Sequence, residues 1–142
     1  MRAAARRRRG VGEGQLRELR IPFVQRALMR HAGGEEEVFT FDLGMRGVFV
    51  ERSEPLPRDS EVDLTFRLPG NELPVVARCR VAWWHAPGAR LVSKRLPAGL
   101  GLEFRSVGDA ETRVRACILD HVHGDPRARR FQPPWPAEDD LP

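Results

Sequence analysis

The sequence lacks the features that mark membrane-spanning and secreted proteins. No apolar run in its 142 residues approaches the roughly 20 residues that a membrane-spanning helix needs. No apolar segment follows the basic run at residues 6–9, so a secretory signal is not expected either. Cysteine is scarce, and Cys79 and Cys117 have no second ligand at metal-binding spacing. We therefore expect two reduced thiols, no membrane insertion and a cytoplasmic location.

Motifs of the common enzyme classes are also missing. The sequence has no tyrosine, no phosphate-binding P-loop and no Gly-x-Gly-x-x-Gly dinucleotide motif. None of its four serines lies near the histidine and aspartate that nucleophilic catalysis needs. His121 and His123 with Asp120 and Asp125 could suggest a metal site, but residues two apart do not share a helix face. We expect no enzymatic activity, no metal and no resident cofactor.

Positive charge is concentrated at the N-terminus. Residues 1–30 hold nine arginines and two glutamates, whereas the remaining 112 residues carry three more acidic than basic groups. Residues 1–15 lack apolar periodicity and are expected to be a disordered basic arm, and the proline-rich residues 124–142 a flexible tail. The arm either attracts phosphates or is a solvated leader, which a misassigned start codon would also produce. Nucleic acid is a poor candidate partner, because the rest of the chain is acidic and shows no basic groove lined with aromatic residues.

Residues 16–123 show the patterns of a small β-rich domain. The clearest strand is at residues 61–68, where apolar and polar residues alternate with the period of a half-buried strand. Residues 73–84 alternate in the same way, and we expect Trp83 on the inner face. Further strands are expected at residues 21–31 (of which 26–30 also fit a helix), 38–43, 48–52 and 100–104, with a hairpin loop over residues 33–37.

The spacing of apolar residues changes after Asp109. Val114, Ile118 and Val122 recur at intervals of four, which predicts a helix over residues 110–121 with Asp109 as its N-cap. Closely spaced strands followed by one helix predict an all-β domain with one helix. The expected architecture is a six-stranded antiparallel β-barrel with a C-terminal α-helix over one opening.

Residues 42–47, Asp-Leu-Gly-Met-Arg-Gly, hold the most informative chemistry of the chain. An acidic residue ends one apolar run, two glycines allow a tight turn, and a second apolar run begins at once. The turn is therefore expected to join two antiparallel strands and to place Asp42 at a sheet edge beside exposed backbone amides. A carboxylate there can accept hydrogen bonds from N1–H and N2–H₂ of guanine, and Gly44 and Gly47 let the backbone approach closely.

Arg17 and Arg20 lie just before the first expected strand, where the arm joins the barrel. A guanidinium binds phosphate through two parallel hydrogen bonds and stacks on purine rings. With Asp42 across the sheet edge, the two arginines would supply a phosphate clamp, a stacking plane and a guanine acceptor. Two surface arginines near a terminus would show the same spacing, so spacing alone leaves both interpretations open.

These motifs resemble the PilZ domain family, the receptors for cyclic di-GMP, over most of the chain. Residues 42–47 are similar to its D/N-x-S-x-x-G signature, and residues 20–23 resemble the end of its R-x-x-x-R element. Further runs resemble the family, in its myxobacterial type: residues 47–57, 64–69, 75–84 and 98–104. The resemblance implies a split barrel in which Arg20 contacts phosphate and a guanine face, Asp42 the guanine edge, and Gly47 forms the turn.

The ligand motif departs from the family pattern at two positions, so it looks degenerate. Gly44 stands where the family has serine, and Leu16 stands where its first arginine should fall, with Arg17 one residue late. A literal R-x-x-x-R exists at Arg26 and Arg30 but falls inside the first expected strand. Loss of the serine hydrogen bond and of one charge-assisted contact would weaken binding by about 30-fold to well over 1,000-fold.

The resemblance implies a non-catalytic bacterial signalling module that binds cyclic di-GMP, even if weakly, and relays it to an unidentified protein partner. The alternative is a degenerate adaptor that no longer binds cyclic di-GMP. Such an adaptor would act through protein contacts alone, for example in a pilus or motility system.

Overall fold

The structure, a computed structural model, describes residues 13–88 and 96–124. The elements in chain order are α2 (Glu13–Glu18), β1 (Arg20–Pro22), β2 (Arg26–His31), β3 (Gly34–Gly44), β4 (Gly47–Glu51), β5 (Glu61–Phe66), β6 (Val75–His85), β7 (Gly99–Ser106), the 3₁₀ turn η1 (Gly108–Ala110) and α3 (Glu111–Gly124). The expected basic arm therefore lies largely outside the described residues, and so does nearly all of the expected C-terminal tail.

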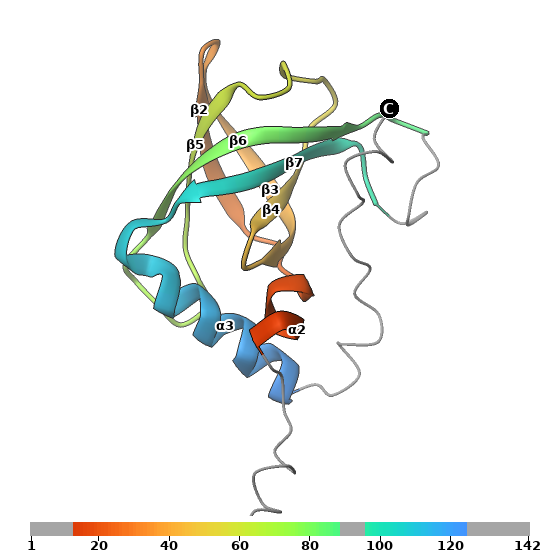
Figure 1. Cartoon of the computed structure of the whole chain (residues 1–142). Helices are drawn as coiled ribbons and strands as arrows, with labels where there is room; N and C mark the ends of the chain where they lie inside the picture. The colour runs from red at the N-terminus through yellow and green to blue at the C-terminus, as the bar shows by residue number, and fades with distance from the viewer. Residues whose placement is uncertain (1–12, 89–95, 125–142) are drawn as a thin grey trace, which may run out of the picture.

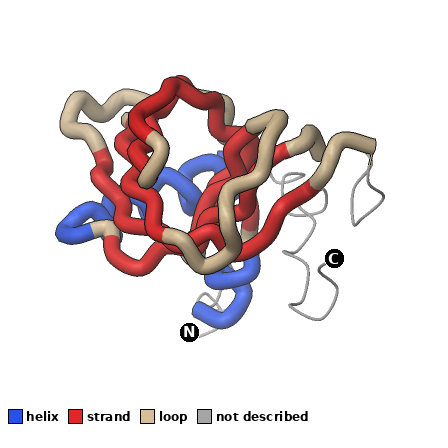
Figure 2. Tube along the Cα trace, turned by 90° about the horizontal axis from the view of Figure 1, so that it is seen from above, coloured by secondary structure: helices blue, strands red, loops and turns tan. Residues whose placement is uncertain are grey.

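Six of the strands form a closed antiparallel barrel. The order of pairing is β3-β2-β5-β6-β7-β4, and pairing of β4 with β3 completes the ring that Figure 2 shows from above. β1 is an extra strand that pairs with β3 beyond the end of β2. The predicted fold class, an all-β six-stranded barrel with a C-terminal helix, is confirmed.

Helices α2 and α3 lie at the same end of the barrel, opposite the turn of the β2–β3 hairpin (Figure 1). α3 buries Val114, Ile118 and Val122, the three positions that the helical spacing indicated. The prediction that Asp109 caps the helix is wrong. Asp109 lies inside η1, which begins at Gly108 with a φ of +63° and brings the chain into α3.

The chain before β4 differs from the sequence-based expectation in three places. The expected strand at 21–31 is two strands, β1 and β2, each paired with a different part of β3. Residues 35–37, expected in a loop, extend β3, because pairing with β2 starts at His31 and Gly34 directly after a two-residue turn. Residues 13–15, expected in the disordered arm, begin helix α2, which buries Leu16.

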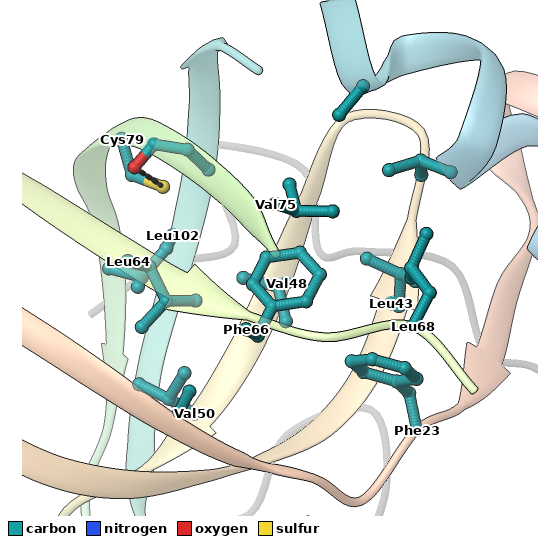
Figure 3. Close-up of a cluster of buried hydrophobic side chains, with 14 of the residues drawn as sticks. Phe23, Leu43, Val48, Val50, Leu64, Phe66, Leu68, Val75, Cys79 and Leu102 are labelled. Atoms are coloured by element: carbon teal, nitrogen blue, oxygen red, sulfur yellow. Dashed lines mark hydrogen bonds between the residues drawn. The ribbon is translucent and has the colours of Figure 1, made fainter. Parts of the chain in front are cut away.

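The core fills the barrel interior and continues under the helices. Buried and more exposed residues alternate along β6, and Trp83 is 5% exposed, so it is buried as predicted. The predicted face is wrong, because the pairing with β7 shifts between Val81 and Trp83. Val81 lies opposite the core residue Leu102, whereas Trp83 lies opposite Gly101 and outside the core cluster. Figure 3 shows side chains of several strands meeting in this core, with Phe23 and Leu43 beside Leu68. No helix within residues 13–88 and 96–124 is long and apolar enough to cross a membrane.

Candidate functional site

Strand pairing brings the start of β1 against the end of β3. Arg20 lies opposite Gly44, and Pro22 opposite Asp42, so residues 20 or more positions apart become neighbours on adjacent strands. The turn between β3 and β4 follows directly after Gly44 and ends at Gly47. In Figure 1 this turn lies at the helical end of the barrel, next to α2.

An irregularity in β3 determines which way Asp42 faces. The register against β4 shifts between Thr40 and Asp42, as in a β-bulge, so that the inward alternation of Val38 and Thr40 resumes at Leu43 instead of Asp42. A bulge re-aims the side chains that follow it, and bulges often lie next to binding sites. Asp42 is therefore only partly covered, with 14% of its side chain exposed.

Arg20 is held almost completely inside the protein, at 3% exposed. Its Nη2 donates to Oδ1 of Asp42 in an ion pair, and its Nη1 donates to the carbonyl oxygen of Gly47 at 3.1 Å. Burial lowers the pKa of Arg20 to about 10, against the opposing effect of Asp42, so the guanidinium stays charged at neutral pH. The side chain thus joins β1, β3 and the first residue of β4.

Position 44 has no room for a side chain, because Arg20 passes directly over it. A Cβ atom at position 44 would lie 2.7 Å from the carbonyl oxygen of Leu19 and 2.8 Å from Nη1 of Arg20. Gly47 has an even closer neighbour, since a Cβ there would lie 2.1 Å from the carbonyl oxygen of Leu102 on β7. Both glycines therefore permit a close approach of neighbouring parts of the chain, whereas a close approach to guanine stays a prediction.

Leu16 and Arg17, at and next to the position of the motif's first arginine, lie on different sides of α2. Leu16 is buried at 2% exposed in the core, where an arginine would be costly. Arg17, the next residue, lies on the exposed side of α2 and stands apart from the contacts between Arg20, Asp42 and Gly47. The structure thus brings together four of the five predicted site residues.

Arg46 is a residue of the site that the sequence analysis did not single out. It lies in the β3–β4 turn with 59% of its side chain exposed, and its Nη1 is 3.8 Å from Oε2 of Glu18 on α2. Its backbone carbonyl accepts a hydrogen bond from the amide of Phe104 at 2.8 Å. The signal in the sequence was that Arg46 lies inside the D/N-x-S-x-x-G match. The signature allows any residue at that position, so it did not draw attention to Arg46.

The site combines a partly exposed carboxylate, a buried guanidinium, an exposed guanidinium and a tight turn. This set can accept hydrogen bonds from a donor edge and can attract an anion. In the described part of the chain, no cluster of three or more His, Cys, Asp or Glu residues could hold a metal ion. Cys79 and Cys117 are free thiols, and burial raises the pKa of Cys79 to about 12.

The model of a protein family described as PilZ domain matches residues 15–122 of the chain. A search of curated proteins gives no match.

Three solved structures resemble the chain at low sequence identity. The PilZ domain of YcgR from Escherichia coli, solved with c-di-GMP, is 14% identical with a TM-score of 0.55, over 78% of this chain and 93% of that chain. The PilZ domain of CeSA from a cellulose-synthesizing bacterium is 18% identical with a TM-score of 0.49, over 73% and 97%. PlzA of Borreliella burgdorferi, in complex with c-di-GMP, is 14% identical with a TM-score of 0.48, over 77% and 38%. At 14% identity, the likeness to YcgR supports the fold.

Proposed function

Because the chain belongs to the PilZ domain family, we propose that it is a non-catalytic bacterial signalling module that binds cyclic di-GMP and relays it to a protein partner. The family match covers residues 15–122, which include the whole barrel and the candidate site. A cytoplasmic location is part of the proposal.

The observation that carries the proposal is the unit formed by Arg20, Asp42 and the turn at Gly47. Arg20 and Asp42 lie at two of the positions where the sequence matches the family's ligand motifs, and they form one ion pair. A carboxylate has two oxygens and accepts up to about four hydrogen bonds, so Asp42 keeps acceptor capacity beyond its bond to Arg20. A guanine edge offers the two adjacent donors that such a carboxylate can accept.

Weak binding is part of the proposal, for two structural reasons. Gly44 offers no hydroxyl, and the space above it is filled by Arg20. Position 16, where the family has its first arginine, is a leucine that is buried in the core. Arg17, at the surface of α2, remains a candidate for the first arginine of the motif.

The alternative is an adaptor that has lost the ligand and acts through protein contacts. One observation favours it: Arg20 and Asp42 already satisfy each other, and Arg20 is buried. In that case the ion pair would be a structural element that fastens β1 to the barrel.

Calorimetry of the full chain with cyclic di-GMP, compared with cyclic di-AMP, tests the proposal. We expect heat with cyclic di-GMP and little with cyclic di-AMP, because the latter lacks the guanine donors that Asp42 would accept. Asp42→Asn, which keeps the size of the side chain, should reduce this preference. Equal heat with both ligands would contradict guanine recognition, and no heat at millimolar cyclic di-GMP would favour the adaptor.

A further inference from the structure

The positive charge of the candidate site is divided between a buried and an exposed arginine. Arg20 is 3% exposed, and its guanidinium donates to Asp42 and to the carbonyl of Gly47. Arg46 belongs to the same turn, but 59% of its side chain is exposed. A phosphate that arrives from solvent therefore reaches Arg46 without breaking a buried interaction, whereas reaching Arg20 requires breaking one.

Arg46 is held in place by its backbone while its side chain can change partner. Its carbonyl oxygen accepts from the amide of Phe104 at 2.8 Å, which ties the turn to β7. Its guanidinium lies 3.8 Å from Glu18, whose side chain is 64% exposed. This separation is longer than a hydrogen bond, and exposed ion pairs of this kind contribute little to stability. A phosphate can therefore displace Glu18 from Arg46.

The charge of Arg46 also acts on the buried part of the site. Burial is the main cause that lowers the pKa of Arg20, and the positive charge of Arg46 lowers it further. Two cations thus repel each other across the turn. An anion bound next to Arg46 would reduce that repulsion, which favours an anionic ligand at this position.

We propose that Arg46 is a phosphate-binding residue of this site and that Arg20 is a positioning residue, which holds the Asp42 carboxylate toward the guanine edge. Leu16 is buried where the family motif would have an arginine, and Arg46 supplies a second guanidinium from the turn instead. This assignment rests on the proposed function, because the phosphate is that of cyclic di-GMP.

Calorimetry of the full chain with cyclic di-GMP tests the assignment through Arg46→Ala and a matched control, Arg30→Ala. Arg30 is also an exposed arginine in an ion pair, with Glu35, but it lies at the hairpin end of the barrel (Figure 1). Arg46→Ala should weaken binding by about 10- to 100-fold at low salt, the effect of one charge-assisted contact. Arg30→Ala should leave the affinity unchanged, and both variants should keep the melting temperature of the wild type.

The dependence of affinity on salt separates the two roles. Salt screens an exposed contact much more than a buried one, so Arg46→Ala should flatten the decline of wild-type affinity with rising salt. Arg20→Lys keeps the charge but loses the two-pronged geometry that orients a carboxylate. It should weaken binding while leaving the salt dependence as steep as in the wild type.

A second pair of variants removes the competing carboxylates. Glu18→Gln should tighten binding several-fold, because Arg46 no longer exchanges one partner for another. Glu35→Gln, the equivalent change beside Arg30, should have no effect on binding.

The outcomes distinguish this inference from the function on which it rests. Weaker binding by Arg46→Ala with a flattened salt dependence supports it. Wild-type binding with an Arg46→Ala affinity equal to that of Arg30→Ala overturns it and leaves the proposed function standing. A flattened salt dependence in Arg20→Lys also overturns it, because Arg20 would then contact the phosphate. No binding by the wild type overturns both.

Discussion

Arg20 and Asp42 form an ion pair in which one partner is almost completely buried. Moving a guanidinium out of water is unfavourable, and the attraction to Asp42 and the bond to Gly47 offset that penalty. Removing one partner leaves the other charge uncompensated inside the protein, whereas replacing both can be nearly neutral. The pair therefore makes stability depend on both residues together.

Arg20→Met and Asp42→Leu should each lower the free energy of unfolding by about 3–5 kcal/mol, and the double variant by clearly less than the sum. Urea denaturation of the four proteins measures this coupling. The exposed pair Arg30 and Glu35 is the control, and we expect little or no coupling there. Additive effects of the two site variants would contradict the buried ion pair.

Gly44→Ser, which restores the family's serine, should destabilise the protein. Its Cβ would meet the carbonyl of Leu19 and the guanidinium of Arg20, so one of them must move, at a cost of about 1–3 kcal/mol. Gly14→Ala is the control, because nothing lies within 4 Å of a Cβ at position 14 in α2. Thermal unfolding compares the two variants. A Gly44→Ser protein as stable as the wild type would show that Arg20 does not occupy this space.

Among the strands, β6 and β7 pack around one aromatic side chain. Trp83 lies against Phe49 with ring centroids 5.4 Å apart, and Gly101 on β7 leaves room for the indole. A Cβ at position 101 would lie 2.0 Å from Nε1 of Trp83. Gly101 on β7 therefore makes the space that Trp83 on β6 fills.

Trp83→Ala should lower the free energy of unfolding by about 3–5 kcal/mol, because it leaves a cavity beside Phe49 on the outer face of the barrel sheet. Trp84→Ala should have a smaller effect, because Trp84 is only partly buried. Chemical denaturation measures both. Iodide quenching is an independent check, since Trp83 should be protected. A larger effect of Trp84→Ala would contradict the deeper burial of Trp83.

The hairpin end of the barrel holds a second group of charges, around Glu36. Oε2 of Glu36 lies 2.9 Å from Nη2 of Arg52 and 2.7 Å from Nε2 of His31, so β2, β3 and the end of β4 are joined. The hydrogen bond from Arg52 is the main cause that holds the pKa of Glu36 below its ordinary value of 4.5. This contribution to stability is complete above pH 4.5 and is lost as the pH falls through the lower pKa of the folded state.

Unfolding by urea at several pH values tests this contribution with Glu36→Gln. The wild type should be more stable than the variant above pH 4.5, and the difference should shrink as the pH falls below that value. Glu37→Gln is the control, because Glu37 is exposed and lies 3.9 Å from Arg26. A difference that stays constant from pH 7 to strongly acidic pH would contradict this role of Glu36.

Local patterns predicted the elements whose environment repeats along the chain. The four-residue spacing of α3 and the burial of Trp83 were predicted correctly. The shift in pairing between Val81 and Trp83, which turns Trp83 away from the face of Val81, was not predicted. The bulge before Asp42 depends on how β3 pairs with β4, and the burial of Arg20 depends on a partner 22 residues away in the sequence. No local pattern records such contacts, so the sequence indicated the residues of the site but not that two of them are paired.

At the scale of the whole molecule, the two ends of the barrel differ in chemistry. The helical end holds the candidate site, with α2 and the β3–β4 turn linked through Glu18 and Arg46. The opposite end holds the hairpin of β2 and β3 with the charges around Glu36. A ligand at the helical end would contact α2, β1 and the β3–β4 turn together. Binding would then act on the N-terminal part of the chain as well as on the barrel.

The most direct test of cyclic di-GMP binding at the candidate site is a nuclear magnetic resonance titration of the ¹⁵N-labelled full chain with this ligand. If cyclic di-GMP binds at the candidate site, the amide shifts concentrate at Arg20, at residues 42–47 and in α2, while those of the hairpin at residues 31–36 stay unchanged. No shift at millimolar ligand, or shifts centred on the hairpin, would contradict it.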